Sequence, residues 1–132
     1  MIVTSRSKKK EFKNYKELKI SKKVFFEKLN VLKKKEIIRL LKRVNPDNIF
    51  YLAGQSSIPK SFILKKETFN SNFIGAKNFV EILYKEKYKT KFFKANSGYI
   101  FKPKNGKISI NSRLIKPNSP YVYAQQKAYN CI

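Results

Sequence analysis

The sequence predicts an α/β fold with a mostly parallel sheet. Short apolar runs of strand length lie at residues 24–29, 48–53 and 91–95, and segments with helical periodicity lie at 33–44 and about 68–87. Strands that alternate with helices form right-handed βαβ units. Such units build a mostly parallel sheet that helices cover on both faces.

The first expected elements lie in the most basic third of the chain. Residues 2–4 are predicted to form a short strand, and a lysine-rich loop at 7–16 precedes the strand at 24–29. In the helix at 33–44, apolar side chains recur at helical spacing, and Lys and Arg occupy the other face. This helix is expected to end at Asn45, because the residue before a proline avoids helical backbone.

The second half repeats the order of strand and helix. The run at 48–53 is almost continuously apolar, as expected of a buried parallel strand, and it ends at Gly54. Ser119 is a suitable N-cap for a last helix that begins with Pro120 and that the end of the sequence cuts off. Between them lie, in order, the helix at about 68–87, a strand at 91–95 and a polar loop at 97–119.

Composition excludes several chemistries. The chain has 132 residues, enough for one domain, with no His and a single cysteine, Cys131. A His-dependent triad, a His-anchored zinc site, an internal disulfide and a cysteine-rich metal site are therefore excluded, and we expect no metal. No apolar run can span a bilayer and the N-terminus does not resemble a signal peptide, so we expect a cytoplasmic protein without a membrane partner.

The net charge is +23, from 31 basic and 8 acidic residues. Such a surface attracts polyanions, so one interpretation is a Lys-rich, non-enzymatic module that binds nucleic acid. However, only four of the basic residues are Arg, the residue that favours bidentate recognition of phosphate and guanine. The other interpretation is compositional drift, because A+T-rich coding sequences overproduce Lys, Asn, Ile, Phe and Tyr. A surface produced by drift would bind polyanions without specificity.

Four segments of the second half carry motifs. They read Asn-Pro-Asp-Asn-Ile-Phe-Tyr-Leu-Ala-Gly-Gln-Ser-Ser at 45–57, Phe-Asn-Ser-Asn-Phe-Ile-Gly-Ala-Lys-Asn-Phe-Val-Glu at 69–81, Lys-Phe-Phe-Lys-Ala-Asn-Ser at 91–97 and Lys-Pro-Asn-Ser-Pro-Tyr at 116–121. In this order they resemble the fourth strand, the next helix, the fifth strand and the entry to the active-site helix of the extended short-chain dehydrogenase/reductase family. The resemblance is greatest to its GDP-mannose 4,6-dehydratases, and it covers residues 44–132.

The resemblance implies an incomplete Rossmann-type, doubly wound parallel sheet. Its first βα unit and its C-terminal substrate domain are expected to be absent. No Gly-x-x-Gly-x-x-Gly turn, which would hold a pyrophosphate, precedes the first strand. Residues 1–132 are therefore expected to form a single, partial NAD(P)-binding domain.

The implied cofactor is NADP, which would lie across the carboxyl ends of the strands. Gly54 allows close approach of backbone to a nucleotide, although small residues at a tight strand exit are equally well explained by packing. Arg6 follows the first strand, where the family often places a base for the 2′-phosphate of NADP, but it is also one cation among 31. The implied cofactor-binding residues are Arg6, Leu52, Ala53, Gly54, Gln55 and Ser56.

The resemblance also implies a catalytic Ser or Thr, and a Tyr whose phenol is acidified by a Lys four residues later. Ser97 keeps the first position. Tyr121 matches the Tyr by position, but Gln125 stands where the Lys is expected. Tyr123 and Lys127 keep the spacing after a shift of two residues. Position favours Tyr121 and chemistry favours the pair Tyr123 and Lys127, so both remain candidates.

A catalytic Glu is missing from the resemblance. Tyr99 stands where the dehydratases have the Glu that removes the C5 proton, and a phenol does not replace a carboxylate base near neutral pH. We therefore expect a GDP-mannose 4,6-dehydratase-like fragment that is inactive alone. GDP-mannose is the nucleotide sugar implied for full-length relatives. A complementing chain or a second copy is the implied protein partner, since the helices at about 68–87 and from 120 form the dimer-forming bundle of the family.

Overall fold

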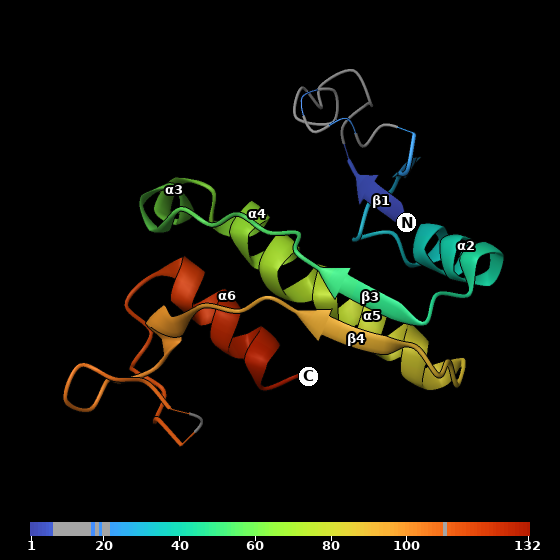
Figure 1. Ribbon diagram of the computed structural model, residues 1–132. Coiled ribbons are helices and arrows are strands. Elements are labelled where there is room, and N and C mark those ends of the chain that lie inside the picture. Colours follow the sequence, from blue (N-terminus) through green and yellow to red (C-terminus); the bar gives the residue numbers. More distant parts are fainter. Residues whose placement is uncertain (7–16, 18, 20–21, 110) are drawn as a thin grey trace.

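A computed structural model of the chain describes residues 1–6, 17, 19, 22–109 and 111–132 (Figure 1). The loop predicted at 7–16 lies outside the described residues. The elements are, in order, β1 (Ile2–Ser5), β2 (Phe25–Lys28), α2 (Lys34–Val44), β3 (Asn48–Tyr51), α3 (Ile58–Ile63), α4 (Lys65–Phe69), the π-helix η2 (Asn70–Ile74), α5 (Gly75–Lys85), β4 (Lys91–Lys94), the 3-10 helix η3 (Gly98–Ile100) and α6 (Pro120–Tyr129). The chain is thus a mixed α/β protein, as predicted.

The strands pair in parallel, but they form two separate sheets. In the described part of the chain, β1 pairs with β2 and β3 pairs with β4, and no strand ladder joins the two pairs (Figure 1). The helices from α3 to α5 form the crossover from β3 to β4 that a parallel pair requires. The predicted parallel pairing is therefore present, but in these residues it is divided between two short sheets.

One face of the strands packs on α2 and α5. Tyr51 of β3 is 4% exposed, and Phe92 of β4 packs against the same cluster. The cluster also contains Leu29, which follows β2, so it links both sheets. Its buried members are Leu29, Ile37, Leu41, Tyr51, Ala76, Phe79, Ile82 and Leu83.

The other face of β3 and β4 remains open. Side chains alternate along a strand, so Phe50 and Phe93 point away from the side that packs on the core. They are 69% and 54% exposed, and their ring centroids lie 5.8 Å apart. In the described residues, helices therefore cover one face of this strand pair, which is consistent with the predicted incomplete doubly wound sheet.

Local capping residues place several helix ends. The end of α2 is as predicted, because its C-cap Asn45 adopts a left-handed conformation and precedes a proline. The Ser119 hydroxyl accepts a hydrogen bond from the Val122 amide at 3.2 Å and caps α6. This helix ends at Tyr129, so the expectation that the end of the sequence cuts it off is wrong.

Two further differences concern the crossover between β3 and β4. The helix expected at about 68–87 begins at Lys65 and is interrupted by the π-helix η2. The helix α3 was not expected, although Ser57 caps it and a proline occupies its first turn.

Within the described residues, no helix combines the length and apolarity that crossing a membrane requires.

Candidate functional site

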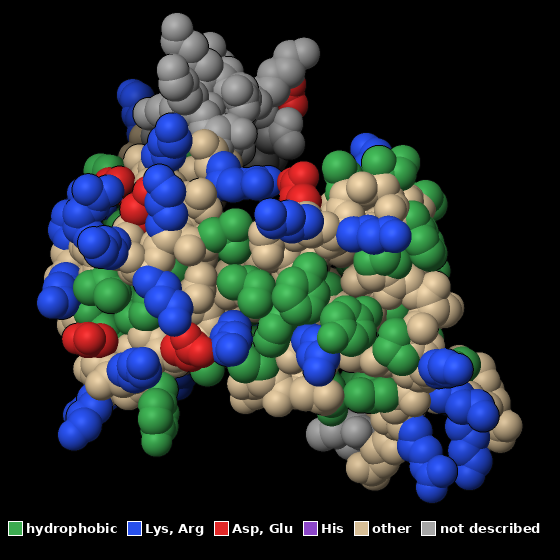
Figure 2. Space-filling model, turned by 180° about the vertical axis from the view of Figure 1, so that it is seen from behind, with side chains coloured by type: hydrophobic (Ala, Val, Ile, Leu, Met, Phe, Trp, Pro, Cys, Tyr) green, Lys and Arg blue, Asp and Glu red, His purple; other side chains and the backbone are tan. Residues whose placement is uncertain are grey.

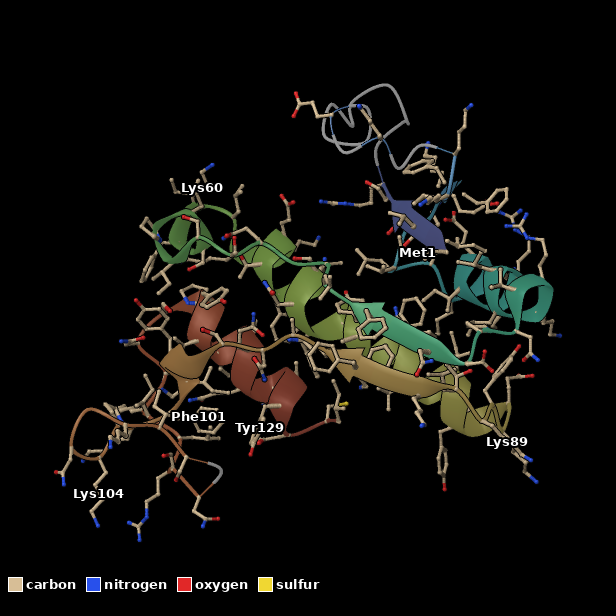
Figure 3. The ribbon with its side chains drawn as sticks, viewed as in Figure 1. Met1, Lys60, Lys89, Phe101, Lys104 and Tyr129 are labelled. Carbon is tan, nitrogen blue, oxygen red and sulfur yellow. The ribbon has the colours of Figure 1, made fainter. Side chains whose placement is uncertain are left out.

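Helix α6 contacts several segments of the second half of the chain, near the carboxyl end of β4. It packs against α4 and η2, and the carboxyl end of β4 leads toward it (Figure 1). The Asn96 side-chain amide donates to the Gln125 backbone carbonyl at 3.4 Å, which fixes the end of β4 on this helix. At the far end of α6, Tyr129 meets Phe101 edge to face, with ring centroids 5.2 Å apart (Figure 3). Carboxyl ends of parallel strands are where ligands of open α/β sheets bind.

A row of polar side chains joins β4 to the loop after β3. Lys94 Nζ donates to Gln125 Oε1 at 2.7 Å, and Gln125 Nε2 donates to Asn72 Oδ1 at 3.1 Å. Asn72 Nδ2 then donates to the backbone carbonyl of Gln55 at 2.9 Å. We call Lys94, Gln125, Asn72 and Gln55 the polar chain. It connects four segments at the carboxyl ends of β3 and β4.

Asn72, a residue of the π-helix η2, lies at the centre of this chain. It is 3% exposed, and its Nδ2 atom also donates to the Thr68 carbonyl at 3.0 Å. A Cβ atom at Gly54 would lie 2.2 Å from Asn72 Oδ1, and Gly54 has a φ of +156°. Packing against Asn72 therefore requires a glycine at position 54, which supports the packing explanation of this residue.

The other residues predicted after β3 differ in their surroundings. Gln55 Nε2 donates to the Ser57 carbonyl at 2.8 Å and to Thr68 Oγ1 at 3.2 Å, so this side chain closes the turn before α3. The remaining three residues of this set, Leu52, Ala53 and Ser56, are exposed. Their surfaces are accessible beside the polar chain.

Arg6 extends from the carboxyl end of β1 toward the crossover helices. Its Nη2 atom lies 3.0 Å from Glu67 Oε1 of α4, and both side chains are exposed. Nearby, the Tyr51 hydroxyl donates to the Ser71 carbonyl at 2.6 Å. Burial raises the pKa of Tyr51, and the positive charge of Arg6 opposes this shift. Arg6 is thus a cation at the strand ends, held by one surface ion pair.

The two candidate tyrosines lie on different sides of α6. Tyr121 is 8% exposed and belongs to a small core cluster with Ile100 and Val122. Tyr123 is 43% exposed, stacks on Phe69 at 5.9 Å and lies under Lys127 Nζ, which is 5.5 Å from its ring centroid. The polar chain contacts α6 at Gln125, which shares the side of Tyr121.

Ser97 and Tyr99 lie in η3, just after β4. The Ser97 hydroxyl accepts a hydrogen bond from the Tyr99 amide at 3.3 Å and caps this short helix. Tyr99 is 71% exposed. The sequence from 95 to 107 contains no Asp or Glu, so this segment brings no carboxylate to the site.

The sequence analysis did not single out Lys94 and Asn72. Lys94 is the last residue of β4, and burial lowers its pKa to about 8. Asn72 lies within the second motif segment, so its place in a motif was available as a signal. For Lys94, the available signal was Gln125, which stands where the resemblance predicts a Lys.

Comparisons with known proteins identify the family of the chain and solved structures with a similar fold. The model of the family described as "NAD dependent epimerase/dehydratase family" matches residues 1–132. Among solved structures, the UDP-Glc/GlcNAc 4-epimerase from Campylobacter jejuni is similar, with a TM-score of 0.82 at 17% identity over 98% of this chain and 39% of its own. The dTDP-glucose 4,6-dehydratase from Bacillus anthracis, solved with NAD, gives 0.75 at 20% identity over 98% and 39%.

A third similar structure is the L-threonine dehydrogenase from Clostridium difficile. It gives a TM-score of 0.79 at 26% identity over 98% of this chain and 38% of its own. No curated protein matches the chain. The chain thus spans about two fifths of the length of these solved structures.

Proposed function

We propose that this chain, which belongs to the NAD dependent epimerase/dehydratase family, forms part of an NADP-dependent nucleotide-sugar 4,6-dehydratase. The observation that carries this proposal is the polar chain from Lys94 to Gln55, at the carboxyl ends of two parallel strands. The preference for GDP-mannose rests on the motif at 45–57. Residues 1–132 would then be one partial cofactor-binding domain.

The residues of this chain fit one part of the cofactor. Arg6 is exposed at the end of β1, and its partner Glu67 is exposed as well, so a phosphate can replace this carboxylate. The exposed residues Leu52, Ala53 and Ser56 would line the nucleotide. Backbone amides for the pyrophosphate would have to come from polypeptide outside residues 1–132, because this sequence has no glycine-rich turn.

When bound, NADP supplies the chemistry of accepting a hydride from the sugar and returning it. Ser97 would donate its hydroxyl to the substrate oxygen, and Tyr121 would hold the proton of that oxygen. We favour Tyr121 over Tyr123 because Tyr121 shares the side of α6 that meets the polar chain. The pair of Tyr123 and Lys127 packs instead beside Phe69.

Loss of water from the sugar requires removal of its C5 proton, and Tyr99 is no carboxylate base at this position. The chain alone would therefore be inactive. A complementing polypeptide or a second copy would complete the enzyme. For a second copy, the face that carries α5 offers a surface, because apolar side chains gather there among Lys and Arg (Figure 2).

The first test compares NADPH and NADH by fluorescence titration of the purified chain. We expect weak binding, in the millimolar range, because the pyrophosphate amides are missing. NADPH should bind better than NADH, and Arg6→Gln should remove this preference. Arg113→Gln, an exposed arginine of the loop before α6, is the matched control. Equal binding of both cofactors, or of neither, would contradict the assignment of NADP.

A second test addresses the substrate. The chain is expressed together with the polypeptides that the adjoining DNA encodes, and GDP-mannose, UDP-glucose and dTDP-glucose are each supplied. We expect formation of the 4-keto-6-deoxy sugar from GDP-mannose only with the added polypeptides. Conversion of another sugar nucleotide, or of none, would refute the proposed substrate.

A further inference from the structure

The ammonium group of Lys94 is partly buried, and no described residue places an opposite charge beside it. Its Nζ atom donates to Gln125 Oε1 at 2.7 Å and to its neighbour's carbonyl, Ala95 O, at 3.0 Å, and both acceptors are neutral. Burial lowers the pKa of its amine to about 8. Placing a cation among neutral groups costs stability, so a neutral side chain would fit this position better. Such unfavourable placement is typical of functional groups.

The position of this ammonium group is informative. Tyr121 and Gln125 are four residues apart and share one side of α6. In the Tyr-x-x-x-Lys pattern, the lysine would stand at position 125. The amine of Lys94 contacts the end of the Gln125 side chain, so it reaches this point from the strand instead of from the helix.

We propose that Lys94 supplies, from the end of β4, the ammonium group that the Tyr-x-x-x-Lys pattern would place at position 125, and that Gln125 holds it there. Positions 94 and 125 thus form one ammonium site, which is filled from the strand. The inference rests on the proposed function, because the group that the ammonium would contact is the bound cofactor or substrate.

The geometry also explains why Gln125 is suited to this role. A Gln side chain accepts at Oε1 and donates at Nε2. Gln125 accepts from Lys94 and donates to Asn72, so both ends of its amide are used. A lysine at position 125 beside Lys94 would place two ammonium groups in contact, and it could not accept the Lys94 proton.

The test exchanges the two residues. The variants are Lys94→Gln, Gln125→Lys, the double exchange Lys94→Gln/Gln125→Lys, and Lys91→Gln as an exposed control on the same strand. The probe is NADP⁺ at millimolar concentration, and binding is followed by saturation-transfer NMR. Circular dichroism of each variant checks that the fold is kept. In Lys94→Gln, the new side chain still offers Gln125 a hydrogen-bond donor. If Lys94 had only a structural role, the affinity for NADP⁺ would therefore be unchanged.

We expect Lys94→Gln to weaken NADP⁺ binding about tenfold, the effect of losing one charged hydrogen bond. The double exchange should recover most of this loss, and Lys91→Gln should bind as the unchanged chain does. If Lys94→Gln binds NADP⁺ as well as the unchanged chain, the inference is wrong although the proposed function stands. If the unchanged chain does not bind NADP⁺ at all, both fail.

A second measurement does not depend on the cofactor. Competitive trace acetylation over a range of pH, read by mass spectrometry, reports the acidity and accessibility of each lysine. Lys94 should titrate near pH 8, below the ordinary range of a lysine, because its amine is partly buried. In Gln125→Lys, two amines share the site, so Lys94 should titrate lower still. Titration of Lys94 at the ordinary pKa of an exposed lysine would show that its amine is not held at this site, and would overturn the inference.

Discussion

Replacing Gly75 by Ala tests how closely α5 packs on β3 and on the segment after β2. A Cβ atom at this position would lie 2.2 Å from the Tyr51 hydroxyl oxygen and 2.6 Å from Val31 Cγ2. The Tyr51 hydroxyl is itself fixed, because it donates to the Ser71 carbonyl at 2.6 Å. Helix propensity alone favours Ala over Gly by about 1 kcal/mol. The sign of the effect therefore distinguishes tertiary packing from local propensity.

The magnitude follows from the two contacts. Overpacking by one methyl group in a tight core costs about 1–3 kcal/mol. Displacing the Tyr51 hydroxyl from its acceptor leaves a buried donor unpaired, which costs about 1–3 kcal/mol more. After subtraction of the propensity gain, the free energy of unfolding should fall by about 1–5 kcal/mol.

The assay is urea unfolding followed by far-UV circular dichroism, with sucrose present to favour the folded state. Gly98→Ala is the matched control, because its Cβ atom would meet only Ile108 Cδ1, at an ordinary 3.5 Å. Tyr51→Phe in the Gly75→Ala background should recover part of the loss, because the clashing oxygen is removed. The reasoning is refuted if Gly75→Ala is as stable as the unchanged chain, or more stable.

The structure supports three further predictions. The purified chain should be marginally stable and prone to aggregate, because two-stranded sheets with open edges are weak; a sharp thermal transition of a monomer would contradict this. Binding to unrelated DNA and RNA sequences should be equal and collapse as salt rises, whereas a preference of about a hundredfold or more at near-physiological salt would favour a nucleic-acid module. The Lys34 ammonium group holds the pKa of Glu81 below its usual 4.5, so this contribution to stability is present above pH 4.5 and is lost as pH falls through the lowered value. Glu81→Gln should flatten that acid loss in urea titrations at pH 3 to 6, and an unchanged slope would count against the ion pair.

Local patterns in the sequence were sufficient to place most elements. Caps depend on adjacent residues, so the end of α2 at Asn45 and the start of α6 after Ser119 could be predicted. Strand pairing depends on residues far apart in the chain, and the division into two sheets was not visible in any single segment. The π-helix η2 was equally invisible, because it spans only five residues, too few to reveal a change of helical period in the sequence.

The candidate site could be predicted only in part, for the same reason. The motifs identified the loop after β3 and the start of α6, which are continuous segments. The contact between Lys94 and Gln125 joins residues 31 positions apart, and the Arg6–Glu67 pair joins residues 61 apart. Neither pairing follows from spacing along the chain. Gln125 stands where the resemblance predicts a Lys, which indicated an altered Tyr-x-x-x-Lys pattern. Only the fold shows that Lys94 is the cation beside it.

The two cations proposed for the cofactor stand on different sheets, which makes the helix layer part of the site. Arg6 follows β1 and Lys94 ends β4, and no strand ladder joins these pairs in the described residues. Their relative position depends instead on the contact of α2 with α5 and on the Asn78 side chain, which donates to the Val31 carbonyl at 3.0 Å. Gly75 lies within this same contact, between Val31 and Tyr51. A side chain there should therefore shift β1 relative to β3 and move Arg6 away from the strand ends, so that cofactor preference changes with stability although Gly75 is no part of the polar chain.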